Sequence, residues 1–293
     1  MVAPVLVGVD GSPGSLKAVE FAVFEAELRR RPLVVFRALP TPVVDAAIGM
    51  TPQFLEVTEE NRTAAWSLVD SVIAHVAEQA PGLSVTGEVT ESIAVGAAII
   101  DRSRDCELVV VGSRGRGGFS DLLLGSTSSQ VAVHAECPVV VVRPPHGEPG
   151  AYRGKIVVGV DDSMTSQPAL AFGFDEASRR GVSLVAIHVF AHPDPRHADP
   201  DRVVAEESRM LAEALAGWQG RYPDVKVVKV VKPGSARRLL CDLSTGAALL
   251  AVGSRGRGGF TGMIFGSTSL AILHHATVPV AVARRLPADL SLS

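Results

Sequence analysis

The sequence predicts an α/β protein built from two tandem doubly wound domains, each with a five-stranded parallel sheet flanked by helices. Three observations predict this. The chain repeats itself over a long spacing, and short β-branched runs alternate with longer stretches of helical periodicity. The runs are also apolar at nearly every position, which is typical of parallel strands covered by helices on both faces.

The repeat is visible in two pairs of segments. The octapeptide GSRGRGGF begins at Gly112 and again at Gly253, and a GSTS tetrapeptide follows each copy. Upstream, VLVGVDGS from Val5 matches IVVGVDDS from Ile156. The first copy is therefore about ten residues longer between these motifs, most naturally in the Pro-containing stretch Leu39–Gln53. So long a period indicates duplicated domains rather than a solenoid of short units.

Each copy is expected to contain five strands separated by helices. The first copy has its predicted strands at Val5–Val9, Leu33–Phe36, Ser84–Val89, Leu108–Val111 and Val139–Val142. The second has them at Ile156–Val160, Leu184–Val189, Lys226–Val231, Leu249–Val252 and Val280–Ala283. Apolar residues at helical spacing run from Leu16 to Ala26 and again from Trp66 to Val76. Strand–helix–strand order requires parallel strands joined by right-handed crossovers.

The two domains are expected to span residues 1–146 and 153–286. Between them, the segment Arg143–Lys155 is rich in proline, glycine and charged residues. This composition is typical of turns and linkers, so it marks the predicted boundary.

Composition narrows the class of protein. The net charge is −3 and there is no basic block, which argues against nucleic-acid binding. Cys106, Cys137 and Cys241 have no metal-type spacing, so we expect buried, inert thiols in a reducing compartment. No apolar run approaches the roughly 20 residues that a membrane-spanning helix needs, and the N-terminus lacks a signal-peptide pattern. We expect a soluble, cytoplasmic protein.

A ligand site is expected at the carboxyl edge of each sheet, because open parallel sheets bind ligands there, where the strand order reverses. Three features of each copy should meet at this edge. They are an aspartate after the first strand, the backbone at the end of the second strand, and the loop after the fourth strand, which enters a helix. The residues are Asp10, Ala38 and Ser126 in the first copy and Asp161, Val189 and Ser267 in the second.

The loop after the fourth strand follows the pattern G-x2-G-x9-G-[ST]. It comprises Gly112, Gly115, Gly125, Ser126 and Thr127, and then Gly253, Gly256, Gly266, Ser267 and Thr268. Glycine lets the backbone approach a ligand without an intervening Cβ, and successive amide groups form a concavity for anions. Hydroxyls at a helix N-terminus add donors where the helix dipole already favours phosphate.

Other interpretations of these residues stand beside the phosphate site. A glycine-rich turn after a strand is often only a tight turn, and duplication copies such a turn. Asp10 and Asp161 suit ribose hydroxyls or a metal, but they or the following serines also suit helix capping. Four loop arginines either reach phosphate or are solvated, namely Arg114, Arg116, Arg255 and Arg257.

The motifs of several nucleotide enzymes are missing from the sequence. It has no GxxxxGK[ST] loop, no GxGxxG after the first strand, and no HExxH, GxSxG or kinase HRD set. No general base is evident beside the predicted phosphate site, and no catalytic residue is assigned. The residues therefore favour binding over turnover.

The VGVDGS segment, the doubled glycine loop, and the CPVVVVR and VPVAVAR segments that end the two copies resemble the universal stress proteins in their tandem, ATP-binding form. The resemblance covers nearly the whole chain. It implies one adenine nucleotide per domain, ATP with Mg²⁺, held by the residues named above, and a homodimer. Two positions depart from the family pattern: the turn before the third helix is Pro233-Gly234-Ser235 in the second copy but Ser92-Ile93-Ala94 in the first. The aspartate that often opens strand four is Glu107 or Ala248.

Three functions follow in order of preference. The first is an ATP-binding regulatory protein of the stress response, whose nucleotide occupancy controls conformation or an unidentified protein partner. The second is a slow ATPase or phosphotransferase. The third is a nucleotide-free interaction scaffold in which the loops are only tight turns.

Overall fold

The computed structural model describes residues 2–41, 57–115, 124–144, 148, 150–161, 166–192, 199–254 and 265–285. The chain divides into two compact units, Met1–Val142 and Arg143–Ser293, and each is described by itself.

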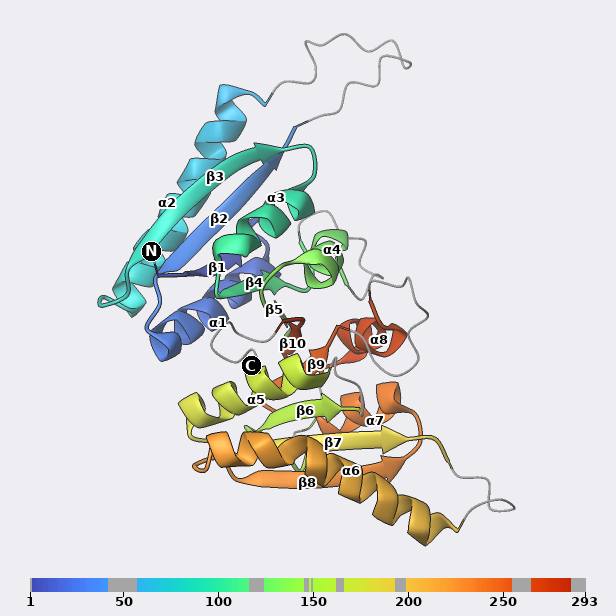
Figure 1. Cartoon of the computed structure of the whole chain (residues 1–293). Coiled ribbons are helices and arrows are strands. Elements are labelled where there is room, and N and C mark those ends of the chain that lie inside the picture. Colours follow the sequence, from blue (N-terminus) through green and yellow to red (C-terminus); the bar gives the residue numbers. More distant parts are fainter. Residues whose placement is uncertain are drawn as a thin grey trace, which may run out of the picture. The chain divides into compact units, whose positions relative to one another are not determined.

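The first unit is a parallel sheet with helices on its crossovers (Figure 1). Its strands are β1 (Val5–Gly8), β2 (Leu33–Pro40), β3 (Val85–Ser92), β4 (Leu108–Gly112) and β5 (Val139–Val142). Its helices are α1 (Pro13–Arg29), α2 (Glu59–Gln79), α3 (Val95–Arg102) with a short 3₁₀ turn at Ser103–Asp105, and α4 (Ser126–His134). The strand order is β3-β2-β1-β4-β5, and every pairing is parallel.

The second unit repeats this plan (Figure 1). Its strands are β6 (Ile156–Val160), β7 (Leu184–Phe190), β8 (Val227–Pro233), β9 (Leu249–Gly253) and β10 (Val280–Ala283). Its helices are α5 (Gln167–Arg180), α6 (Pro200–Arg221), α7 (Ala236–Leu243) and α8 (Ser267–His275). The order is β8-β7-β6-β9-β10, again with parallel pairings. The predicted fold class, two doubly wound α/β domains with five parallel strands each, is confirmed.

The extra length of the first copy lies where the repeat predicted it. Residues 41–58 connect β2 to α2, whereas only residues 191–199 connect β7 to α6. The strands and helices themselves have similar lengths in the two units, so the difference leaves the sheets unchanged.

Helices cover both faces of each sheet, since right-handed crossovers place α1 and α2 on one face and α3 and α4 on the other. The face of α2 that packs on the sheet carries Val69, Val72 and Val76, as its periodicity predicted. At two predicted positions the side chain is largely outside the core: Leu16 of α1 is 46% exposed and Trp66 of α2 is 44% exposed.

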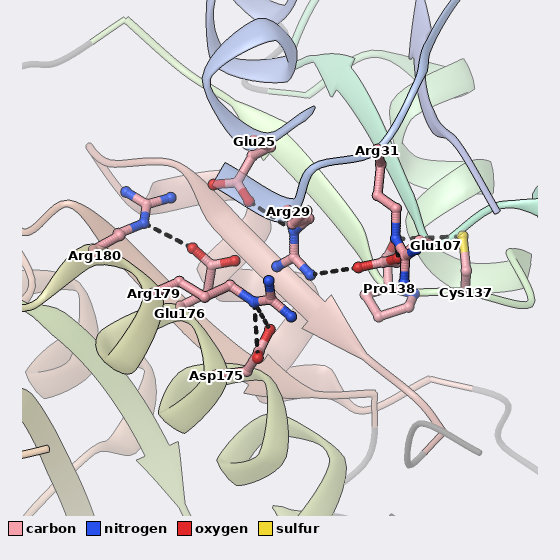
Figure 2. Close-up of polar contacts among 10 residues, drawn as sticks. All are labelled: Glu25, Arg29, Arg31, Glu107, Cys137, Pro138, Asp175, Glu176, Arg179 and Arg180. Atoms are coloured by element: carbon pink, nitrogen blue, oxygen red, sulfur yellow. Dashed lines mark hydrogen bonds and ion pairs between the residues drawn. The ribbon is translucent and has the colours of Figure 1, made fainter. Parts of the chain in front are cut away.

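A buried ion network lies at the carboxyl end of α1 (Figure 2). Nε of Arg29 lies 2.9 Å from Oε2 of Glu25, and Nη1 of the same guanidinium lies 3.2 Å from Oε1 of Glu107. Arg31 binds the second oxygen of Glu107. Glu25 is fully buried and Arg29 is 7% exposed, so each charge needs its partners. Glu107, a departure from the family pattern, thus joins the start of β4 to the end of α1.

The second unit keeps only part of this network. Arg180 binds Glu176 at 2.7 Å at the matching place on α5 (Figure 2), and Glu176 is fully buried. The positions that correspond to Arg31 and Glu107 are Val182 and Ala248. A charged pair in one copy is therefore matched by an apolar pair in the other.

The three thiols are sheltered. Cys106 and Cys137 are buried and Cys241 is half-buried, and all three are free. Burial raises the pKa of the Cys106 and Cys241 thiols to about 11, and burial also raises the pKa of Cys137. A raised thiol pKa leaves little thiolate at neutral pH, which agrees with the expectation of inert thiols.

We expect Glu107→Ala to lower the free energy of unfolding by about 1–3 kcal/mol, because the buried Arg29 loses one of its carboxylates. Urea unfolding of the full chain measures the change. The matched control is Asp101→Ala, which removes an exposed pair with Arg104 and should stay within about 0.5 kcal/mol of the parent. Equal losses in both variants would contradict a special role for Glu107.

Alkylation by iodoacetamide at about pH 7 should be at least ~10-fold slower in the folded chain than in urea, because the thiols are buried and mostly protonated. Mass spectrometry of the alkylated peptides measures the rate at each cysteine. The rate in the folded chain should rise as the pH approaches 11, where Cys106 and Cys241 ionise. Alkylation of the folded chain at the unfolded rate would show that these sites open freely.

Candidate functional site

The centre of the first sheet is its topological switch point. Strand β1 pairs with β2 on one side and with β4 on the other, with Val5 opposite Leu108 and Val7 opposite Val110. The chain leaves β1 through α1 and leaves β4 through α4, on opposite faces of the sheet. The two connections therefore separate beyond the carboxyl ends of these strands, and a crevice is expected there.

A cavity of about 600 Å³ occupies this crevice in the first unit. All seven residues predicted for the first copy line it, namely Asp10, Ala38, Gly112, Gly115, Gly125, Ser126 and Thr127. The structure thus brings together three segments that are far apart in sequence. That these residues bind a ligand stays a prediction.

Asp10 is held in a local turn at the start of α1. Its Oδ1 accepts a hydrogen bond from the backbone N–H of Ser12 at 2.9 Å, and its own N–H donates to Oγ of Ser15 at 3.4 Å. Ser12 is the N-cap of α1, and its Oγ accepts from the N–H of Ser15 at 3.2 Å. Ser12 therefore caps this helix, and the carboxylate of Asp10 lines the cavity.

The glycines after β4 make close approaches that a side chain would block. A Cβ on Gly115 would lie 2.4 Å from Oδ2 of Asp10. One on Gly112 would lie 2.6 Å from the backbone of Gly14, and one on Gly14 would lie 2.7 Å from the carbonyl oxygen of Arg114. The loop therefore packs backbone to backbone on the first turn of α1, and its second glycine lies against the aspartate.

Helix α4 begins at the cavity without a side-chain cap. Its start at Ser126 matches the prediction, and the N-cap residue Gly125 has no side chain to offer. In α8 the equivalent residues are Ser267 and Gly266, again without a side-chain cap. By contrast, Thr58 accepts from the first turn of α2. The first-turn amides of α4 are thus available to an anion in the cavity, which the helix dipole also favours.

Two hydrogen bonds close the base of the loop. The N–H of Gly125 donates to the carbonyl of Ser113 at 2.8 Å, and Oγ of Ser128 donates to the carbonyl of Gly112 at 2.6 Å. The second unit has the same pair at the same distances, from Gly266 to Ser254 and from Ser269 to Gly253. The sequence analysis did not single out Ser128 or Ser269, although the doubled GSTS tetrapeptide contains both.

In the second unit the described site residues occupy matching places. Asp161 follows β6, Val189 lies within β7, and Gly253 ends β9. Gly266, Ser267 and Thr268 form the N-cap and first turn of α8. Gly256 lies outside the described residues, as do Arg116, Arg255 and Arg257 of the two loops.

One wall of the first cavity is apolar. Phe36, Pro40, Val95 and Ile99 line it opposite the glycines, and Arg37 also lines the cavity. The sequence analysis missed all five, because neighbouring strands and helices supply them through tertiary packing rather than through a motif.

The turn before the third helix differs between the units at the departure noted in the sequence. In the second unit, Gly234 follows β8 with a φ of 142°, which favours glycine. In the first unit the turn from Glu91 to α3 is one residue longer, since Leu39 pairs with Glu91 whereas Phe190 pairs with Pro233. The Oγ of Ser92 accepts there from the N–H of Ala94 at 3.3 Å.

Two other kinds of site are not found in the described parts of the chain. No described helix is both long and apolar enough to cross a membrane. No group of three or more His, Cys, Asp or Glu side chains among the described residues is arranged to hold a metal ion.

Comparison with known proteins places this architecture. The model of the universal stress protein family matches residues 1–143 and again residues 153–284. The chain belongs to the universal stress protein family. A universal stress protein of Mycolicibacterium smegmatis is 41% identical over 289 residues, covering 96% of each chain. One of Mycobacterium tuberculosis is 40% identical over 289 residues, covering 96% of this chain and 97% of its own.

A solved member of the universal stress protein family has the same fold. The crystal structure of a universal stress protein from Archaeoglobus fulgidus covers 96% of this chain and 98% of its own, with a TM-score of 0.69. Its identity to this chain is 22%, so it supports the fold alone. The tandem form predicted from the doubled loop is confirmed by the two family matches.

Gly112→Ala should lower the free energy of unfolding by about 1–3 kcal/mol, because its Cβ would collide with the backbone of Gly14. Gly217 of α6 is the matched control, since nothing lies within 4 Å of an added Cβ there. Gly217→Ala should instead stabilise the chain by about 0.5–1 kcal/mol, because alanine favours a helix interior. Urea unfolding of both variants measures the two signs, and a Gly112→Ala chain as stable as the parent would contradict the packing described.

Proposed function

We propose that each domain binds one adenine nucleotide, ATP with Mg²⁺, and that occupancy regulates conformation or a protein partner in the stress response. The observation that carries this is the convergence of all seven predicted residues of the first copy on one cavity of about 600 Å³. That volume lies within the range of about 300–1,000 Å³ typical of small-molecule sites. The proposed domains are residues 1–146 and 153–286.

The two walls of the cavity support a division of labour. The first-turn amides of α4 and the hydroxyls of Ser126 and Thr127 suit the phosphates, because they are donors at a positive helix end. The apolar wall, which includes Ile99 and Phe36, suits a flat base. Asp10 accepts hydrogen bonds and carries negative charge, so it suits ribose hydroxyls and would repel phosphate.

The same cavity supports binding rather than turnover. Among the described residues that line it, Asp10 has the one carboxylate, and its Oδ1 already accepts the N–H of Ser12. No histidine is among these lining residues. A general base must reach the proton that it abstracts, and none of these lining side chains other than Asp10 offers one. We therefore place the regulatory function ahead of a slow ATPase.

The second domain is proposed to hold a nucleotide in the same way. Its support is the matching positions of Asp161, Gly253 and Gly266, and the identical closure of its loop by Ser269. Gly256 is proposed as the counterpart of Gly115. A homodimer and a regulatory protein partner stay predictions from the family resemblance.

Gly115→Ala should weaken ATP binding at the first site at least ~10-fold, because the new methyl group collides with the carboxylate of Asp10. Isothermal titration with ATP and Mg²⁺ measures the affinity and the number of sites per chain. Gly82→Ala is the matched control, since an added Cβ there meets nothing within 4 Å. It should bind as the parent does.

Three outcomes separate the competing functions. Binding near two nucleotides per chain with no release of phosphate supports the proposal. Sustained phosphate release that Asp10→Ala abolishes while ATP still binds would move the chain to the slow ATPase. Absence of binding, with no nucleotide carried through purification, would leave the interaction scaffold.

A further inference from the structure

The peptide that leads from β1 into Asp10 is held by a side chain of the neighbouring strand. Arg37 lies on β2, and its Nη1 donates to the carbonyl oxygen of Val9 at 3.1 Å. Val9 immediately precedes Asp10, whose N–H donates to Oγ of Ser15 at 3.4 Å. Because a peptide is planar, these two bonds hold the Val9–Asp10 unit from both sides. They therefore set the direction in which the aspartate side chain leaves the backbone.

The second unit has the same bond from a different side chain. His188 occupies on β7 the position of Arg37 on β2, since Leu184 and Leu33 pair with the first residues of β6 and β1. Its Nδ1 lies 2.9 Å from the carbonyl oxygen of Val160, which precedes Asp161. The carbonyl only accepts, so Nδ1 must donate. A guanidinium and an imidazole thus serve the same acceptor in the two copies.

We propose that Arg37 and His188 are positioning residues for nucleotide binding, which fix Asp10 and Asp161 through the carbonyl oxygens of Val9 and Val160. The inference rests on the proposed function and extends it to residues that no motif contains. Neither residue needs to touch the nucleotide, since each acts by holding the peptide that carries the aspartate. Removing the donor lets that peptide rotate and turns the carboxylate away from the ribose.

The two anchors differ in their dependence on protons. The guanidinium of Arg37 keeps its protons throughout the physiological range. His188 is 2% exposed, and its Nε2 lies 2.8 Å from Oε2 of Glu207 on α6. Serving both the carboxylate and the Val160 carbonyl takes two N–H groups, which only the protonated imidazole has. A neutral imidazole keeps one, and the carboxylate is the stronger acceptor.

The surroundings of His188 contain few other charges. Glu207 is the charged group of α6 that contacts it, and Asp161 lies one residue beyond its acceptor on β6. Val231 of β8, which pairs with it, is neutral, and the ring of Phe190 stacks at 6.5 Å. The first residues of α5, on the same face, are Gln167 and Pro168, and neither is charged. On the other face, α7 contributes Arg237, Arg238 and Asp242.

The test is a double-mutant cycle on the full chain, read by isothermal titration with ATP and Mg²⁺ in an Asp161→Ala background that isolates the first site. Arg37→Met should weaken binding about 5- to 10-fold. In a chain that also carries Asp10→Ala, the same substitution should change the affinity less than about twofold, because it acts through Asp10. Arg37→Lys, which keeps a donor, should restore most of the loss. Arg104→Met, at an exposed site outside the cavity, is the control.

A pH profile supplies a second readout. With the first site disabled by Asp10→Ala, binding at the second site should be at least about threefold weaker at about pH 8 than at about pH 6, because the neutral imidazole releases Val160. The first site, isolated by Asp161→Ala, corrects for the titration of ATP itself. His188→Phe should remove the excess pH dependence of the second site.

The outcomes separate this inference from the proposed function. If the parent chain binds no nucleotide, the proposed function fails. If the parent binds and Asp10→Ala weakens binding but Arg37→Met does not, the positioning role is overturned and the binding function stands. An equal loss from Arg37→Met with and without Asp10, together with a lower unfolding midpoint, would also overturn it, because that is the signature of a general structural role.

Discussion

The parallel pairing of β1 with β4, and of β6 with β9, is the constraint on which the rest of each unit depends. Parallel neighbours cannot be joined by a short turn, so the chain builds β2 and β3 on one side of β1 before β4 closes the other side. The connections after these two central strands then start side by side and leave in opposite directions. Asp10 belongs to one connection and Gly112 begins the other. Their proximity, and the backbone contact between Gly14 and Gly112, follow from this pairing.

The two units satisfy this constraint with different side chains. The carbonyl before the aspartate is held by Arg37 in one and by His188 in the other. Glu107 joins a helix to a strand by charge, whereas Ala248 stands at the same place in an apolar contact region. The turn before the third helix uses a left-handed glycine, Gly234, in one copy and an extra residue in the other. The backbone arrangement is what the copies share, and the side chains that secure it are interchangeable.

The long repeat, the alternation of strands and helices and the apolar strands were enough to predict the fold, because periodicity and connectivity are local in sequence. Glycines followed by serine also predicted the starts of α4 and α8 at Ser126 and Ser267. Arg37 and Ile99 were missed because strand register and helix docking bring them to the cavity, and no local pattern encodes those. Leu16 was placed on the wrong face for a related reason, since periodicity does not say how far a covering helix extends over its sheet. The ligand roles of the predicted site residues stay predictions.

The closure of the loop base has a consequence for how this protein can change. Gly125 and Ser128 return to the backbone of Ser113 and Gly112, so the segment between Gly115 and Leu124 starts and finishes at points fixed by the sheet and by α4. Replacing that segment with another of different length or chemistry leaves these two attachment points in place. Each unit therefore contains a natural cassette, in which a new recognition element can be inserted beside the cavity without redesigning the domain that carries it.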